Sequence, residues 1–157
     1  MAGPEVGAQV VLVLTSAALF YAALTDLKEF KIRNEVIYLL VGLFVLHAIL
    51  TGRWTTIYWN IALALVILLS TLWFYAHGMV GGGDVKILTV AFLWVGIDYA
   101  LALALLTLAF STLHAAAAKI GWMRAEYAGG RLRIPFAPSV AAALIGCFML
   151  GCGSVAP

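Results

Sequence analysis

The chain has 157 residues, of which 65% are apolar and only 10% are charged. Soluble globular domains are about 25% charged and about 45–50% apolar, so this composition excludes a molecule whose surface faces water throughout. The net charge of +2, without a basic cluster interleaved with aromatic residues, also excludes a typical nucleic-acid partner. We therefore expect one membrane domain over residues 1–157, built from spans of about 20 apolar residues.

Charged residues divide the first half of the chain into three expected spans. They cover residues 6–25, 36–50 and 54–76. Neither Lys nor Arg precedes the first apolar run, so we interpret it as a permanent span and not as a cleaved signal peptide. A polar turn at residues 26–35 follows this span, and Asn34 is the expected N-cap of the next helix.

A glycine-rich stretch at residues 77–84 interrupts the helical pattern. It contains three consecutive glycines, which are poor helix formers, so a loop or re-entrant element is expected there. Only residues 87–97 are uncharged before Asp98, too few to cross a bilayer. The fourth span must therefore include the neighbourhood of Asp84, which draws this carboxylate towards membrane depth.

The remainder of the chain predicts a fifth span at residues 99–118 and a sixth at residues 134–150, joined by a basic connector. The expected fold class is therefore all-α, a polytopic membrane protein of about six transmembrane helices. Four tryptophans lie near expected span ends, where they would act as interfacial anchors. They are Trp54, Trp59, Trp94 and Trp122.

Basic residues concentrate in the odd-numbered connectors between these spans. The positive-inside rule then places the odd connectors in the cytoplasm and both termini outside. We also expect the connector at residues 119–133 to contact anionic lipid head groups of the bilayer. The basic residues are Lys28, Lys31 and Arg33 in the first connector, Lys86 near the third, and Lys119, Arg124, Arg131 and Arg133 in the fifth.

Two carboxylates are expected at membrane depth, where ionisable groups are costly and usually functional. Asp26 closes the first span and Asp84 opens the fourth, so the alternation of spans places both at the cytoplasmic edge. If these two spans pack together, the carboxyl groups can face each other. Like charges a few ångströms apart cannot both ionise cheaply, so one would keep a proton. Such a pair can activate water and polarise a peptide carbonyl.

The residues around Asp84 also allow close approach of a substrate. Gly81, Gly82 and Gly83 have no side chains, so an extended peptide backbone could lie against Asp84. Lys86 is two residues further along and would point to another helix face, as a head-group anchor.

The histidines and cysteines discussed next are expected to have structural roles. We interpret His47 and His114 as interhelical hydrogen-bond donors. Cys147 and Cys152, five residues apart in an apolar stretch, are interpreted as small apolar side chains. The sequence shows no His, Cys and carboxylate group with metal-ligand spacing, so neither a metal nor another cofactor is expected.

Residues 81–86 (GGGDVK) resemble the GxGD motif of polytopic aspartyl proteases, in the GxGDxK form of prepilin peptidases. Asp26 with residues 31–34 (KIRN) is similar to that family's first aspartate motif, although Arg33 stands where the family usually has proline. Residues 131–139 resemble its final connector and span. The resemblance implies that Asp26 and Asp84 are catalytic, with Gly81, Gly82, Gly83 and Lys86 supporting substrate binding.

This resemblance also implies a substrate and a location. The chain looks like the compact members associated with tight-adherence (Flp) pili, or like archaeal preflagellin peptidases, and no N-methyltransferase activity is expected. The family's substrates are pilin-like precursors, cleaved after a glycine where a cytoplasmic leader meets a hydrophobic helix in the inner (cytoplasmic) membrane. A small proton- or ion-coupled transporter using the same aspartates is the alternative. The edge position of both carboxylates and the lack of an inverted repeat favour the protease.

Overall fold

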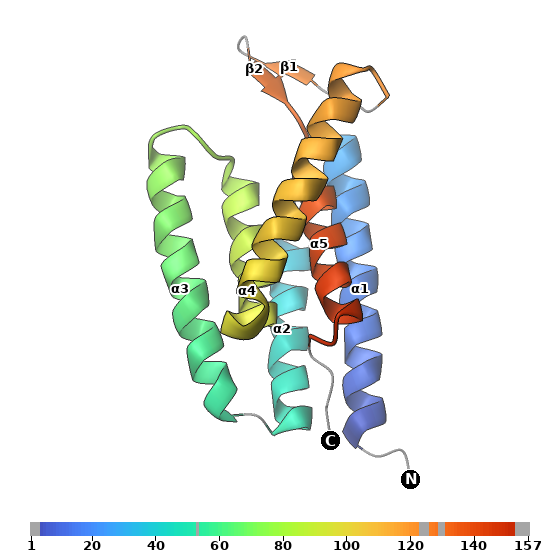
Figure 1. Cartoon of the computed structure of the whole chain (residues 1–157), viewed down its shortest axis with the longest axis vertical. Coiled ribbons are helices and arrows are strands. Elements are labelled where there is room, and N and C mark those ends of the chain that lie inside the picture. The colour runs from blue at the N-terminus through green and yellow to red at the C-terminus, as the bar shows by residue number, and fades with distance from the viewer. Residues whose placement is uncertain (1–3, 53, 123–125, 129–130, 153–157) are drawn as a thin grey trace.

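A computed structural model describes residues 4–52, 54–122, 126–128 and 131–152 as a helical bundle with one short hairpin (Figure 1). Four of the described helices are long and apolar enough to cross a membrane, which confirms the predicted all-α polytopic class. The helices are α1 (Pro4–Glu29), α2 (Asn34–Thr51), α3 (Trp54–Ala76), α4 (Gly82–Lys119) and α5 (Ala137–Met149); strands β1 (Glu126–Ala128) and β2 (Arg131–Arg133) pair antiparallel.

The outer surface of the bundle is apolar, as lipid requires. Large side chains such as Val13, Leu69 and Leu101 are between 67% and 72% exposed. Figure 1 shows α3 at one side of the bundle, α1 at the other, and α5 against both α1 and the second half of α4. The core therefore lies around α5, whose side chains Val140 and Leu144 are fully buried.

Helix α4 consists of two halves that run in opposite directions. Gly96 has φ +61° and ψ −164°, a conformation that glycine adopts readily and other residues rarely. The side chain of Asn60 fills the space where a Cβ on Gly96 would lie. The chain reverses here, so the expected fourth and fifth spans are separate segments that meet at Gly96, two residues before Asp98 (Figure 1). The total of six spans and their orientation stay predictions.

Helix α5 is shorter than the expected sixth span at residues 134–150. Its 13 residues extend about 20 Å at 1.5 Å per residue, less than the roughly 30 Å of hydrocarbon. Pro135 and Phe136 precede the helix, whose second residue is Pro138; proline is tolerated this early because the N–H that it lacks would have no partner within the helix. The helix is therefore shorter than the expected span, and a sixth crossing of the membrane stays a prediction.

The turn between α1 and α2 is also shorter than predicted. Helix α1 continues to Glu29, so Asp26 lies within a helix and not in the turn. The chain turns at Phe30, which has φ +50°. The N-cap of α2 is Arg33, and Asn34 is the first helical residue instead of the cap. The apolar-to-polar change at position 26 marked the membrane edge, whereas helical hydrogen bonding continues beyond it.

Trp94 does not lie at the interface as predicted. It is only 4% exposed, its Nε1–H donates a 3.1 Å hydrogen bond to the backbone carbonyl of Leu40, and its ring packs edge-on against Phe44 and Phe148. Position 94 precedes the reversal at Gly96, on the face of α4 that points into the bundle. By contrast, Trp54, Trp59 and Trp122 are exposed.

Candidate active site

Asp26 connects the end of α1 to the start of α5. Its side chain is only 5% exposed, and Oδ2 accepts a 2.9 Å hydrogen bond from the backbone N–H of Ala137. The backbone N–H of Phe136 donates to the same carboxylate. These N–H groups belong to the first turn of α5, where no carbonyl of the helix itself can accept them. The N-cap residue of α5, Phe136, makes no capping hydrogen bond with its side chain. The carboxylate of Asp26, on α1, caps the helix instead.

Asp84 occupies the first turn of α4. It is the third residue of the helix, and its carboxylate accepts a hydrogen bond from the backbone N–H of Gly81, the N-cap. This arrangement resembles the reciprocal bond of a capping box, and the helix dipole favours a negative charge at this end. The side chain is partly buried, so it is held at the edge of the packed bundle.

The two carboxylates lie close enough for their charges to repel. Their helices, however, do not pack together, because no Cα atom of α1 lies within 8 Å of a Cα atom of α4 among the described elements. The direct packing of the first and fourth spans, which was the condition for the two carboxyl groups to face each other, is therefore not what the structure shows. Both helices pack against α5 instead, and Asp26 is hydrogen-bonded to its N-terminal end.

The three glycines before Asp84 sit at close contacts. A Cβ on Gly81 would lie 3.0 Å from Oδ2 of Asp84, so the absence of a side chain leaves this carboxylate uncrowded. A Cβ on Gly82 would lie 3.4 Å from the ring of Tyr75, and one on Gly83 would lie 3.3 Å from Ile32. Gly82 and Gly83 thus let the start of α4 pack against α3 and against the turn after α1.

Lys86 joins the first turns of α4 and α2. Its Nζ donates a 2.8 Å hydrogen bond to Oδ1 of Asn34. The side chain is exposed and directed at α2, and its expected role as a head-group anchor stays a prediction. Asn34 belongs to the site region although its sequence position predicted only a cap. Only the position of Asn34 at the end of residues 31–34 (KIRN), the segment that resembles the family's first aspartate motif, could have indicated this role.

His114 interacts with both Ser139 and Asp26, which the sequence did not predict. His114 is 7% exposed, and its Nδ1 lies 3.4 Å from Oγ of Ser139, which confirms a hydrogen bond between α4 and α5. The imidazole also interacts electrostatically with Asp26. No motif indicated this approach, because the residues come from three different helices.

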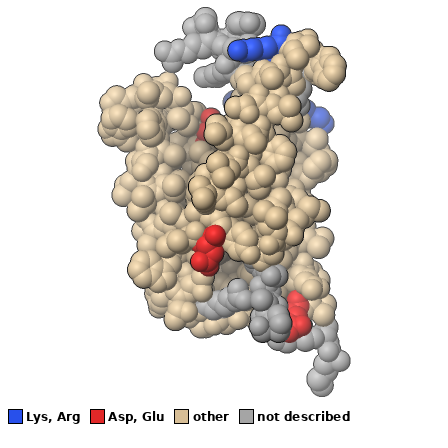
Figure 2. All heavy atoms as spheres, viewed as in Figure 1, with Lys and Arg blue, Asp and Glu red and all other residues tan. Residues whose placement is uncertain are grey.

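Basic residues gather at the end of the bundle that carries the two aspartates. On the face shown in Figure 2, the Lys and Arg side chains lie at this end, whereas acidic residues also appear lower down. They include Lys28 at the end of α1, Lys86 at the start of α4 and Lys119 at its end.

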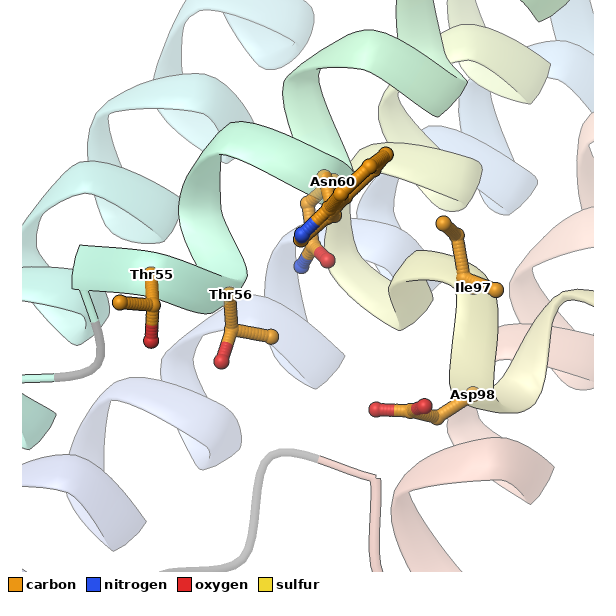
Figure 3. Close-up of a pocket in the computed structure, with 6 residues that line it drawn as sticks. Thr55, Thr56, Asn60, Ile97 and Asp98 are labelled. Atoms are coloured by element: carbon orange, nitrogen blue, oxygen red, sulfur yellow. The ribbon is translucent and has the colours of Figure 1, made fainter.

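A pocket of about 440 Å³ lies at the opposite end of the bundle, where α4 reverses (Figure 3). Asp98 projects towards α3, whose residues Thr55, Thr56 and Asn60 line the same space. In the described part of the chain, no three His, Cys, Asp or Glu side chains come together as a metal site would require. The pocket contains neither Asp26 nor Asp84 and lies at the other end of the bundle from them.

The sequence matches the type IV leader peptidase family over residues 13–118, more than half of the chain. The matched range includes both aspartates, the three glycines and Lys86, and it ends before α5. No curated protein and no solved structure matches the chain. The family match alone establishes membership, and the chain therefore belongs to the type IV leader peptidase family.

Proposed function

We propose that this leader peptidase is an intramembrane aspartyl endopeptidase with Asp26 and Asp84 as its catalytic pair. The electrostatic interaction between the two carboxylates, which lie at the same end of the bundle, is the observation that carries the proposal. Family membership supports peptidase activity on prepilin-like precursors, and the geometry suits the aspartyl mechanism. Nothing in the family match or in the described residues supports the transporter alternative.

The proposed mechanism places a water molecule between the two carboxyl groups. The ionised carboxylate takes a proton from this water as it attacks the scissile carbonyl, and the protonated partner donates a hydrogen bond to the carbonyl oxygen. Backbone N–H groups of Ala137 and Gly81 each donate a hydrogen bond to one of the two carboxylates. These bonds would restrict the orientation of both side chains before reaction.

The surroundings of the pair support a cytoplasmic membrane edge. Basic residues at this end predict that it faces the cytoplasm, and the exposed ones would contact anionic lipid head groups. A precursor with a cytoplasmic leader and a hydrophobic helix would present its junction at that depth. The protein would accordingly reside in the inner membrane, with a pilin-like precursor as its partner.

Gly81 and Lys86 have proposed supporting roles. Gly81 keeps the approach to Asp84 open for a substrate backbone, since a Cβ would lie against the carboxylate. Lys86 fixes the first turn of α4 through Asn34, and this turn carries Asp84. Gly82 and Gly83 serve the packing of the same turn.

Co-expression with a candidate pilin precursor, scored by the gel shift on leader removal, tests the proposal. Asp26→Asn and Asp84→Asn should each abolish cleavage while the protein remains in the membrane fraction. Glu5→Gln is the matched control, because Glu5 is exposed in the first turn of α1, at the opposite end of this helix from Asp26. Appreciable cleavage by either single variant of the pair would exclude the two-aspartate mechanism.

A further inference from the structure

The pocket where α4 reverses brings polar side chains of two helices together (Figure 3). It has a volume of about 440 Å³ and lies between the start of α3 and the second half of α4. Asp98 projects into it from α4, and the amide of Asn60 is directed at the same space from α3. The described residues that line it also include Thr55, Thr56, Trp59 and Ile97. These side chains give the cavity one carboxylate, one amide and two hydroxyl groups.

Asn60 is a buried polar residue whose hydrogen-bonding capacity is unused within the described part of the chain. It is only 8% exposed, and its side chain packs against the backbone of Gly96 at the reversal. No hydrogen bond joins its amide to another described residue. The amide borders the cavity, so a molecule in the pocket can reach it. A buried amide without a partner is costly, which indicates that the pocket normally holds one.

The chemistry of the lining selects an organic ammonium group. Asp98 is the only charged residue among the described lining residues, and its carboxylate attracts a cation. The hydroxyls of Thr55 and Thr56 can accept N–H donors, and the ring of Trp59 attracts a cation through its face. A volume of about 440 Å³ suits a small organic group and is far larger than a metal ion needs. Calcium-type ions would also favour several carboxylates, and the described lining has one.

The pocket lies where a lipid head group would be. Helix α3 has 23 residues and extends about 34 Å at 1.5 Å per residue, more than the roughly 30 Å of hydrocarbon. Its first turn, which carries Thr55 and Thr56, therefore reaches the head-group region. Exposed leucines follow Asp98 on the same face of α4, at spacings that repeat with the helix: Leu101, Leu105 and Leu108. A head group in the pocket would thus place its acyl chains against an apolar stripe.

We propose that this pocket binds a zwitterionic lipid whose head group ends in a primary ammonium, as that of phosphatidylethanolamine does. The ammonium N–H groups donate to the carboxylate of Asp98 and to the amide oxygen of Asn60, while the threonine hydroxyls donate to the phosphate. A choline head group has no N–H to donate, and a glycerol head group has no positive charge. Bound lipid would join the start of α3 to the reversal of α4. The site is independent of the proposed protease function.

Competitive lipid binding to the purified full chain tests the proposal. Native mass spectrometry would count the lipids retained when phosphatidylethanolamine, phosphatidylcholine and phosphatidylglycerol are added in equal amounts. The native protein should retain phosphatidylethanolamine in preference to the other two. Asp98→Asn should lower the affinity for this lipid about tenfold, the size of one charge-assisted hydrogen bond, and leave the other two unchanged. Glu5→Gln is the matched control, because Glu5 is an exposed carboxylate that is not part of the pocket lining.

Two results would overturn the proposal. Equal retention of the three lipids would mean that the pocket holds water only, and native affinity in Asp98→Asn would mean that the carboxylate does not bind the ammonium.

Two further measurements separate the lipid from a free amine and test the hydroxyls. Glycerophosphoethanolamine has the same head group without acyl chains, so it should not displace the lipid at equal concentration. Displacement would show that a soluble amine, and not a lipid, is the occupant. Thr56→Val keeps the shape of an exposed side chain and should lower the affinity two- to fivefold; native affinity in this variant would contradict the role of the hydroxyl. Neither measurement depends on whether the protein cleaves a precursor.

Discussion

The carboxylate of Asp26 accepts a hydrogen bond from the backbone N–H of Ala137, a residue 111 positions later in the chain. One side chain thus joins the first and last helices of the bundle and also interacts electrostatically with Asp84. Helix α5 lies beyond the matched family range, yet it supplies the N–H groups that hold a candidate catalytic residue. The candidate site therefore depends on α5 to hold Asp26 in place, although α5 contributes neither of the two aspartates.

Substitution of Asp26 should separate its capping role from catalysis. Asparagine caps helices about as well as aspartate, so Asp26→Asn should lose cleavage but keep its free energy of unfolding within about 1 kcal/mol of the native value. Asp26→Leu leaves the N–H groups of α5 without an acceptor and should cost a further 1–2 kcal/mol, roughly the value of a helix cap. Unfolding in detergent measures both, with Asp98→Leu as control. Equal stability of the two Asp26 variants would show that the hydrogen bond to Ala137 contributes nothing.

The bond between Lys86 and Asn34 predicts coupled effects on activity. Lys86→Met and Asn34→Ala should each reduce kcat/KM about two- to fivefold, because each frees the first turn of α4. The double variant should be little worse than either single variant, since one interaction is lost in all three. Lys119→Met, at the far end of α4, is the control for lost positive charge. Additive losses would mean that the two residues act separately.

Gly81→Ala should impair catalysis without unfolding the protein. The backbone of Gly81 has φ −75° and ψ 145°, which alanine adopts freely, but the new methyl group would lie 3.0 Å from Oδ2 of Asp84. We expect a loss in kcat of about tenfold, equivalent to about 1.4 kcal/mol of transition-state stabilisation, with little change in melting temperature. Gly42→Ala is the matched control, because a Cβ there meets nothing within 4 Å. A native kcat in Gly81→Ala would contradict the crowding argument.

Gly96→Ala should destabilise the whole bundle. The φ of +61° disfavours alanine, and the new Cβ would collide with the side chain of Asn60. A loss of more than about 1 kcal/mol is expected from the backbone alone. Adding Asn60→Ala should restore only part of the stability, since it relieves the collision but not the φ strain. Thermal unfolding in detergent, with Gly42→Ala for comparison, measures both effects; a native melting temperature in Gly96→Ala would refute the role of this turn.

Much of the candidate site could be predicted because the change from apolar to charged residues along the sequence marks the edges of the membrane. Asp26 and Asp84 are charges at the ends of long apolar runs, so their common depth followed from counting spans. The motif around Asp84 placed Gly81 and Lys86 beside it in the chain. The partner of Lys86 and the neighbours of Asp26 could not be predicted, because Asn34, Ala137 and His114 reach the site through tertiary packing.

By itself, the sequence determined that this is a polytopic helical membrane protein, roughly where its helices lie, and which two carboxylates sit at one edge. Only the tertiary structure decided that α1 and α4 both pack against α5, that Trp94 is buried, and that His114 interacts with Asp26. The physical reason is that these helices are apolar on all sides. Lipid and protein interior favour the same side chains, so no amphipathic pattern shows which face of a helix packs against another.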